Sequence, residues 1–87
     1  MLAMKPLSLQ TPSQLADHLR SFRKARGLTQ TQLGRLVGSG QARIARIENH
    51  PDRVSVATLL KMLNALRVKV LLTPVDAPRG PPDPSDW

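Results

Sequence analysis

The 87-residue sequence contains no cysteine. Disulfide bonds and thiolate metal sites are therefore excluded, which fits a reducing cytosol. The first ten residues hold one Lys and no apolar run of signal-peptide length. Nowhere does the chain approach the roughly 18 consecutive apolar residues that cross a bilayer. We therefore expect a small cytoplasmic protein with no membrane association.

Acidic residues are also scarce, with six Asp and Glu against 13 Lys and Arg, which gives a formal net charge of +7. Residues 1–73 hold twelve of the basic and three of the acidic residues, and residues 74–87 hold the rest. A body this basic suits a polyanionic partner, because neutralised phosphates release counterions. On charge alone, a ribosome-like or merely basic protein fits equally well.

The sequence contains no residue pattern typical of a catalytic or metal-binding site. His18 and His50 have no Cys or carboxylate neighbours at ligand spacing, which favours surface positions for both. No base stands at a recognisable spacing from a serine, and no Walker-type phosphate loop occurs. We expect no enzymatic activity, no metal and no small-molecule cofactor.

The first helix is predicted over residues 12–26, after an irregular arm at 1–10. Thr11 at the N-cap and Gln14 three residues later form a capping box, and Gly27 ends the helix. One apolar stripe follows from the helical spacing of Leu15, Leu19 and Phe22.

Two shorter helices follow, separated by a turn at residues 38–40. The first begins at Thr29, which forms a second capping box with Gln32, and the next covers about 41–49 before Pro51 stops it. The side chains predicted to face inward are Leu33, Leu36, Val37, Ile44 and Ile47.

A fourth helix, capped by Ser55, is predicted to run to about Leu66. Its expected core face comprises Leu59, Leu60, Leu63 and Leu66, with Val56 and Met62 beside them. Residues 67–73 include several β-branched side chains and roughly alternate between polar and apolar, which indicates a strand. A fifth helix or an extended coil is the alternative. A lone strand cannot satisfy its own backbone groups. Its expected partner is the same strand of a second copy, with dimer contacts from Val68, Val70, Leu71 and Leu72.

Residues 74–87 contain five of the eight prolines, a density that no helix or interior strand accommodates. We therefore divide the chain into an arm at 1–10, a domain at 11–73 and a disordered tail at 74–87. Trp87 is the only Trp. It is either just the end of the tail or an anchor for a partner's pocket.

The stretch 27–49 reads as a basic helix-turn-helix unit, whose second helix would enter the DNA major groove. Gln41 suits adenine, Ala42 a thymine methyl group and Arg46 guanine. Arg43 would read a base or hold a phosphate. The alternative for each arginine is a solvated surface cation without a role in DNA binding. The full set of predicted DNA-binding residues is Gln30, Arg35, Gly40, Gln41, Ala42, Arg43, Ala45 and Arg46. In this set, Gln30 and the free N–H groups beside it would bind a phosphate, and Arg35 would add backbone charge.

A family resemblance rests on Gln30, Leu33, Gly38, Gln41, Ile44, Ile47 and Glu48, which match the lambda-repressor-like Cro/C1-type pattern without a gap. That family implies an ion pair between Arg23 and Glu48. The segments TPSQLADHLR, GLTQTQLGRLVG and QARIARIEN, the NHPD loop and the Trp-ended tail resemble the HipB-type antitoxins of bacteria. This resemblance implies a homodimer on a palindromic operator near its own promoter. It also implies that a HipA-type serine/threonine kinase toxin is bound with help from Trp87.

Three positions depart from the family pattern. Gly40 replaces a Ser, Thr or Lys, Ser39 replaces an apolar residue, and Arg43 replaces a small Thr. We therefore expect the same binding mode but a different operator sequence. The predicted fold is mainly α, with four helices and one C-terminal strand that pairs across a homodimer. Two other functions fit the sequence: an inhibitor for which DNA binding is secondary, and a stand-alone phage-type or housekeeping repressor without a toxin.

Overall fold

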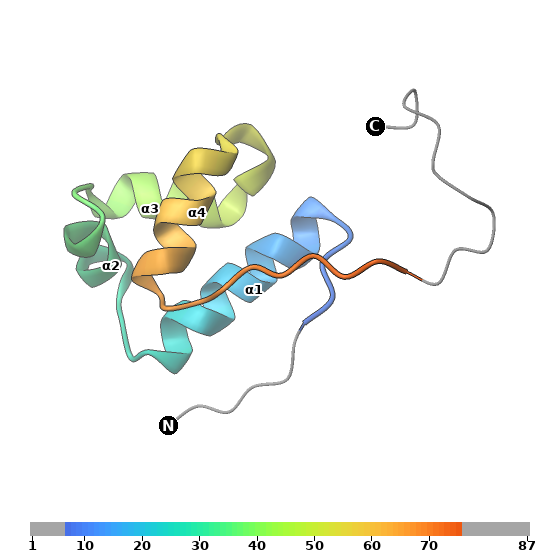
Figure 1. Cartoon of the computed structure of the whole chain (residues 1–87). Coiled ribbons are helices and arrows are strands. Elements are labelled where there is room, and N and C mark those ends of the chain that lie inside the picture. Colours follow the sequence, from blue (N-terminus) through green and yellow to red (C-terminus); the bar gives the residue numbers. More distant parts are fainter. Residues whose placement is uncertain (1–6, 76–87) are drawn as a thin grey trace.

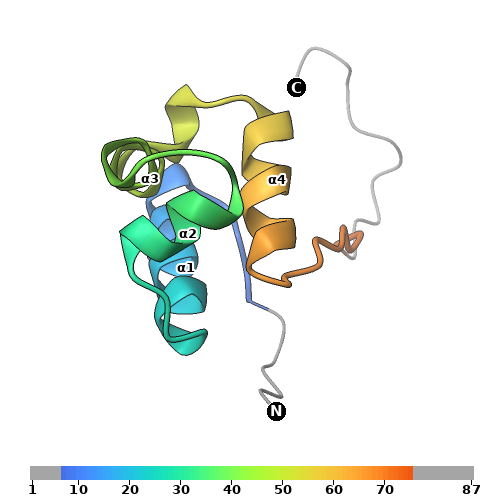
Figure 2. The ribbon, with the colours of Figure 1, turned by 90° about the vertical axis from the view of Figure 1, so that its left-hand side faces the viewer.

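The computed structural model describes residues 7–75, which form four α-helices and one short 3-10 helix. The elements are α1 (Pro12–Ala25), α2 (Gln30–Leu36), α3 (Gln41–Asn49), η1 (Pro51–Arg53) and α4 (Val56–Ala65). In Figure 1, α1 underlies the bundle, and α2 and α3 follow it as a closely connected pair. Figure 2 shows α3 and α4 on opposite sides of the bundle, with α2 between them and α1 behind.

The helix starts follow from the predicted caps. Thr11 and Thr29 each accept a hydrogen bond from a backbone N–H group, and Gln14 and Gln32 return the second bond of each capping box. Ser55 caps α4 by accepting from the backbone of Thr58. Each of these bonds satisfies an N–H group that the first helical turn leaves without a partner.

Three helices end in the same local geometry. Gly27 after α1 and Gly38 after α2 have φ values of 68° and 70°, and Arg67 after α4 has φ 61°. The next N–H group bonds back to the helix in each case, as from Ser39 to the carbonyl of Gly34 at 2.7 Å. This is the Schellman motif, in which a left-handed residue closes the last turn. Glycine adopts that conformation without strain and Arg67 does not.

The core lies between all four α-helices. Its buried side chains are Leu19, Leu33, Ile44, Ile47, Met62, Leu63 and Leu66. Leu15, Phe22 and Val37 pack against this cluster as half-buried neighbours. The predicted inward faces of α1 and α3 are therefore confirmed.

Two leucines predicted to be internal are instead exposed, as is a valine predicted to lie beside the core face. Leu36 on α2 is 60% exposed, because the buried side of this helix is centred on Leu33 and Gly34. Val56 and Leu60 on α4 are 69% and 43% exposed. They stand one turn apart, beside the stripe that faces the core, and so form an apolar edge on the surface.

The segment after α4 is not helical as far as residue 75, so a fifth helix there is excluded within the described chain. Residues 69–75 make no backbone hydrogen bonds to other described residues in a single copy. No strand is assigned between residues 7 and 75. The single chain thus has the predicted mainly α fold, without the strand pairing that requires a partner.

Candidate nucleic-acid interface

Helix α3 presents one side to solvent and the other to the core. Ile44 and Ile47 are 0% and 2% exposed and hold the helix against the bundle. The predicted base-reading side chains are not part of this buried contact, since Gln41, Ala42 and Arg46 are exposed and Ala45 is half-buried. We call these four residues the reading face.

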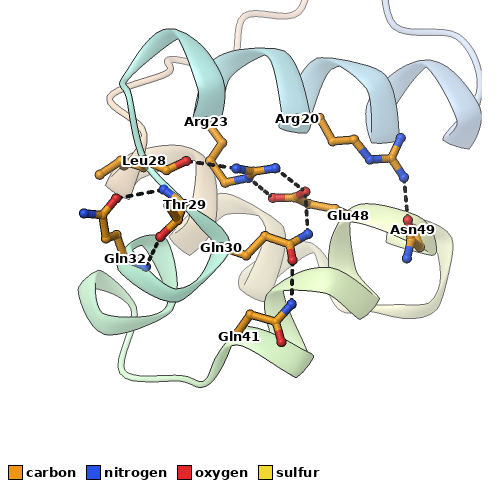
Figure 3. A network of polar contacts seen from close by, with 9 residues as sticks. All are labelled: Arg20, Arg23, Leu28, Thr29, Gln30, Gln32, Gln41, Glu48 and Asn49. Carbon is orange, nitrogen blue, oxygen red and sulfur yellow. Dashed lines mark hydrogen bonds and ion pairs between the residues drawn. The ribbon is translucent and has the colours of Figure 1, made fainter.

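A continuous set of hydrogen bonds connects the reading face to the interior (Figure 3). Gln41 donates from Nε2 to Oε1 of Gln30 at 2.6 Å. Gln30 in turn donates from Nε2 to Oε1 of Glu48 at 3.2 Å. Glu48 is fully buried and receives Arg23, whose Nε lies 2.6 Å from Oε2. The sequence predicts a phosphate contact for Gln30 and does not indicate either of these two hydrogen bonds.

The direction of these bonds is fixed by the carboxylate, which can only accept. Glu48 therefore turns the NH₂ group of Gln30 towards itself and leaves the carbonyl oxygen of Gln30 facing Gln41. That oxygen must be met by the NH₂ group of Gln41. The remaining N–H and the carbonyl oxygen of Gln41 form a donor and acceptor pair, which is complementary to N7 and N6 of adenine.

The predicted ion pair between Arg23 and Glu48 is confirmed. Arg23 makes a second contact to Glu48 from Nη2 at 3.3 Å and donates from Nη1 to the carbonyl of Leu28 at 2.9 Å. Its side chain is 11% exposed and that of Glu48 is 0% exposed. Such a buried pair is held by its additional hydrogen bonds, and removal of one partner leaves an unpaired charge. It fixes α1, the α1–α2 loop and α3 relative to one another.

The end of α3 is also attached to α1, through a hydrogen bond from Nη2 of Arg20 to Oδ1 of Asn49. Sequence reasoning missed this contact, because an arginine and an asparagine on different helices carry no spacing signal. Because Gln41 is bonded to Gln30 at the start of the helix, α3 is held by polar bonds at both of its ends. A helix fixed in this way keeps its reading face in one orientation.

The turn before α3 lies unusually close to α2. A Cβ atom built on Gly34 would stand 2.6 Å from the carbonyl oxygen of Ser39, so only glycine fits without a shift. Gly40 is the N-cap of α3, with φ −94°, and contributes no side-chain capping bond. Nothing lies within 4 Å of a Cβ built there. The predicted site residue Gly40 is thus exposed and open, and Gly34 sets the distance between turn and helix.

The remaining predicted DNA-contacting cations are both exposed. Arg35 lies on α2 and Arg43 on α3. Neither takes part in an ion pair with another residue of the range 7–75, where the only pairs are Arg20–Asp17 and Arg23–Glu48. Their charges are therefore available to a polyanion.

The predicted dimer residues lie along the exposed segment after α4. Val68 is half-buried against the core, and Val70, Leu71 and Leu72 are 48%, 67% and 94% exposed. Trp87, predicted to contact a toxin, lies outside the described residues. In the part of the chain that is described, no group of three potential metal ligands occurs. Nor is any helix there long and apolar enough to cross a membrane.

Known proteins match this chain over most of its length. The helix-turn-helix family model HTH_3 covers residues 19–72. Two Escherichia coli proteins named antitoxin HipB are 33% and 32% identical over 78 residues, which is 90% of this chain and 81% and 86% of theirs. The solved structure of a HipB–O1–O2 complex superposes with a TM-score of 0.71 at 32% identity, covering 78% of this chain and 99% of that one. A HipA–HipB–O2–O3 complex superposes with a TM-score of 0.73 at 31% identity, covering 80% and 99%.

Proposed function

Because the chain belongs to the helix-turn-helix family and, within it, to the HipB antitoxins, we propose that it is a sequence-specific repressor that also neutralises a toxin. The protein acts by binding and not as an enzyme. The observation that carries the DNA-binding role is the reading face of α3, which is exposed on one side and attached to buried Glu48 on the other. It would act in the bacterial cytoplasm, where its operator lies.

On DNA, α3 is the recognition helix and its N-terminal half enters the major groove. Gln41 reads an adenine through the donor and acceptor that Gln30 leaves free. Ala42 and Ala45 permit close approach, and Arg46 reaches guanine O6 and N7. Arg35 adds a contact with the sugar–phosphate backbone of the DNA. Gly40 contributes no side chain, so its backbone can approach the DNA closely.

We also propose that the protein is a homodimer whose segments 67–73 pair as strands across the two-fold axis. Two observations support this. The backbone of residues 69–75 has no hydrogen-bonded partner in one copy, and the exposed apolar side chains of α4 and of this segment need cover. A symmetric dimer would bind an inverted repeat, with its recognition helices about one helical turn apart.

The toxin partner proposed here is a HipA-type serine/threonine kinase. Support comes from the likeness to a chain of a HipA–HipB–O2–O3 complex and from the Pro-rich segment that carries Trp87. A Trp on a Pro-rich segment is suited to fill a pocket of a partner. Autoregulation follows if the operator lies at the promoter of the module's own genes.

The DNA-binding role is tested by selection of bound duplexes from a random pool, followed by footprinting. We expect an inverted repeat with two protected half-sites, bound by two copies. Selection of no consensus would refute sequence-specific repression. A footprint from one copy on an asymmetric site would refute the dimer alone.

The antitoxin role is tested by co-purification with the product of the adjacent gene, followed by deletion of residues 75–87. We expect a kinase-like partner whose affinity falls on deletion while operator affinity is unchanged. The absence of an adjacent kinase gene and of any co-purified kinase would instead favour a stand-alone repressor. An unchanged kinase affinity would remove the tail from the mechanism.

A further inference from the structure

A surface pocket of about 180 Å³ lies between the α2–α3 turn, α3 and α4, away from the Gln41–Glu48 contacts. Its base includes Ile47 and Met62, both buried core residues. Ser39 and Thr58, which both line the pocket and are half-buried, each carry a hydroxyl group. Thr58 Oγ1 accepts a hydrogen bond from the hydroxyl of Ser55 at 2.9 Å, so its own proton is free to be donated.

Two cations complete the lining of this pocket. Arg43 comes from α3 and Lys61 from α4, and both side chains are exposed. Neither forms an ion pair within residues 7–75, and no Asp or Glu lines the pocket. Two uncompensated positive charges and two hydroxyl donors around one hollow select an anion with several oxygen acceptors.

The position of the pocket relative to the recognition helix identifies the source of that anion. Arg43 is about 100° around α3 from Ala42, on the flank that faces α4, and is therefore outside the reading face. A helix about 10–12 Å in diameter nearly fills a major groove about 12 Å wide. The flanks of a seated helix therefore face the two sugar–phosphate walls of the groove.

We propose that this pocket, the phosphate pocket, holds a single backbone phosphate of the operator. The proposal rests on the proposed DNA-binding function and adds Lys61, Ser39 and Thr58 to its contacts. Arg43 and Lys61 pair with the charged oxygens of one phosphodiester, and the hydroxyl groups donate to them. Arg43 thereby acts on the backbone and not on a base edge, and its contribution is independent of sequence.

The test measures the salt dependence of binding to the operator and to a scrambled duplex. Each phosphate contact contributes a slope of about 0.9 in log affinity against log salt concentration. If Arg43 and Lys61 share one phosphate, the double variant Arg43→Ala with Lys61→Ala lowers the slope by about 0.9 on both duplexes. The preference for operator over scrambled duplex is then retained. A reduction near 1.8 would mean two separate phosphates, and no reduction would mean no contact; either result overturns the proposal.

Two further arms locate the contact. Lys61→Arg keeps the positive charge and should retain the wild-type slope of log affinity against log salt concentration. Lys24→Ala removes a cation from α1 outside the pocket and should also leave this slope unchanged. Neutral methylphosphonate placed at successive backbone positions should weaken the wild-type protein at each phosphate that it contacts. The double variant should lose this sensitivity at one of those positions per half-site. Equal sensitivity of both proteins would overturn the proposal, whereas equal binding of operator and scrambled DNA by the wild type would refute the proposed function.

Discussion

Gln41 and Gln30 share a hydrogen bond of 2.6 Å across 11 residues of sequence, which joins the first turn of the recognition helix to the first turn of α2. Glu48 sets the direction of this bond by accepting from the NH₂ group of Gln30. If Gln41 contacts a base as proposed, Gln30 is a positioning residue for that contact. It would then act on specificity without touching a base.

Gln41→Ala is expected to weaken operator binding by about 1–3 kcal/mol and to relax the choice of base at one position per half-site. Gln30→Ala should relax the same position, because the Gln41 amide is then free to rotate. The double variant should discriminate no less than Gln41→Ala alone. Competition binding with every base substituted at that position measures the effect; losses at different positions for Gln30 and Gln41 would contradict the coupling.

Glu48→Ala is expected to lower the free energy of unfolding by about 3–5 kcal/mol, because Arg23 is left as a largely buried, unpaired cation. The exposed pair Arg20–Asp17 supplies the comparison. Asp17→Ala should cost less than about 1 kcal/mol, since solvent screens that contact. Urea denaturation of both variants measures the difference, and equal losses would show that burial does not govern the Arg23–Glu48 pair.

Gly34→Ala is expected to destabilise the domain by about 1–3 kcal/mol, because the new methyl group would collide with the backbone of Ser39. Gly40→Ser provides a matched control. The space around Gly40 is open and its backbone suits an N-cap, so serine there should be neutral or stabilising by a few tenths of a kcal/mol. Thermal unfolding monitored by circular dichroism distinguishes the two; a neutral Gly34→Ala would show that the turn yields easily.

Leu60→Glu is expected to weaken the proposed dimer by about 3 kcal/mol or more, because it would bury an unpaired charge at the interface. Leu36→Glu alters another exposed leucine, on α2 and not on α4, and should leave the dimer intact. Sedimentation equilibrium gives the dissociation constants. Dimers of equal strength from both variants would place the interface elsewhere.

Much of the fold can be predicted because its signals are local. Thr11, Thr29 and Ser55 cap the helices where predicted, and Gly27 and Gly38 end two of them. Arg67 is different, since a left-handed arginine has no sequence signature and the predicted strand began at this residue. The exposure of Leu36 and Leu60 was not predicted either, because helical spacing does not identify which apolar side chains meet the core.

The sequence indicates which residues belong to the candidate site, but not how hydrogen bonds connect them. The exposure of Ala42 and Arg46 follows from their distance in angle from Ile44 and Ile47 on one helix. The contact between Gln41 and Gln30 depends on the rotamers of two flexible side chains and on the crossing of two helices. The pocket beside Arg43 depends on α4, which is distant in sequence. Spacing alone reveals neither.

The hydrogen bonds that run from Arg23 to Gln41 also restrict how related modules can diverge within one genome. In a duplicated copy, a change at Gln41 removes the bond to Gln30 and leaves the Gln30–Glu48 contact without that support. Changes at Gly40 or Arg46 break no such bond. If Gln41 reads a base as proposed, drift in operator preference should begin at those two positions, and cross-talk between paralogues should persist longest at the base pair that Gln41 would contact.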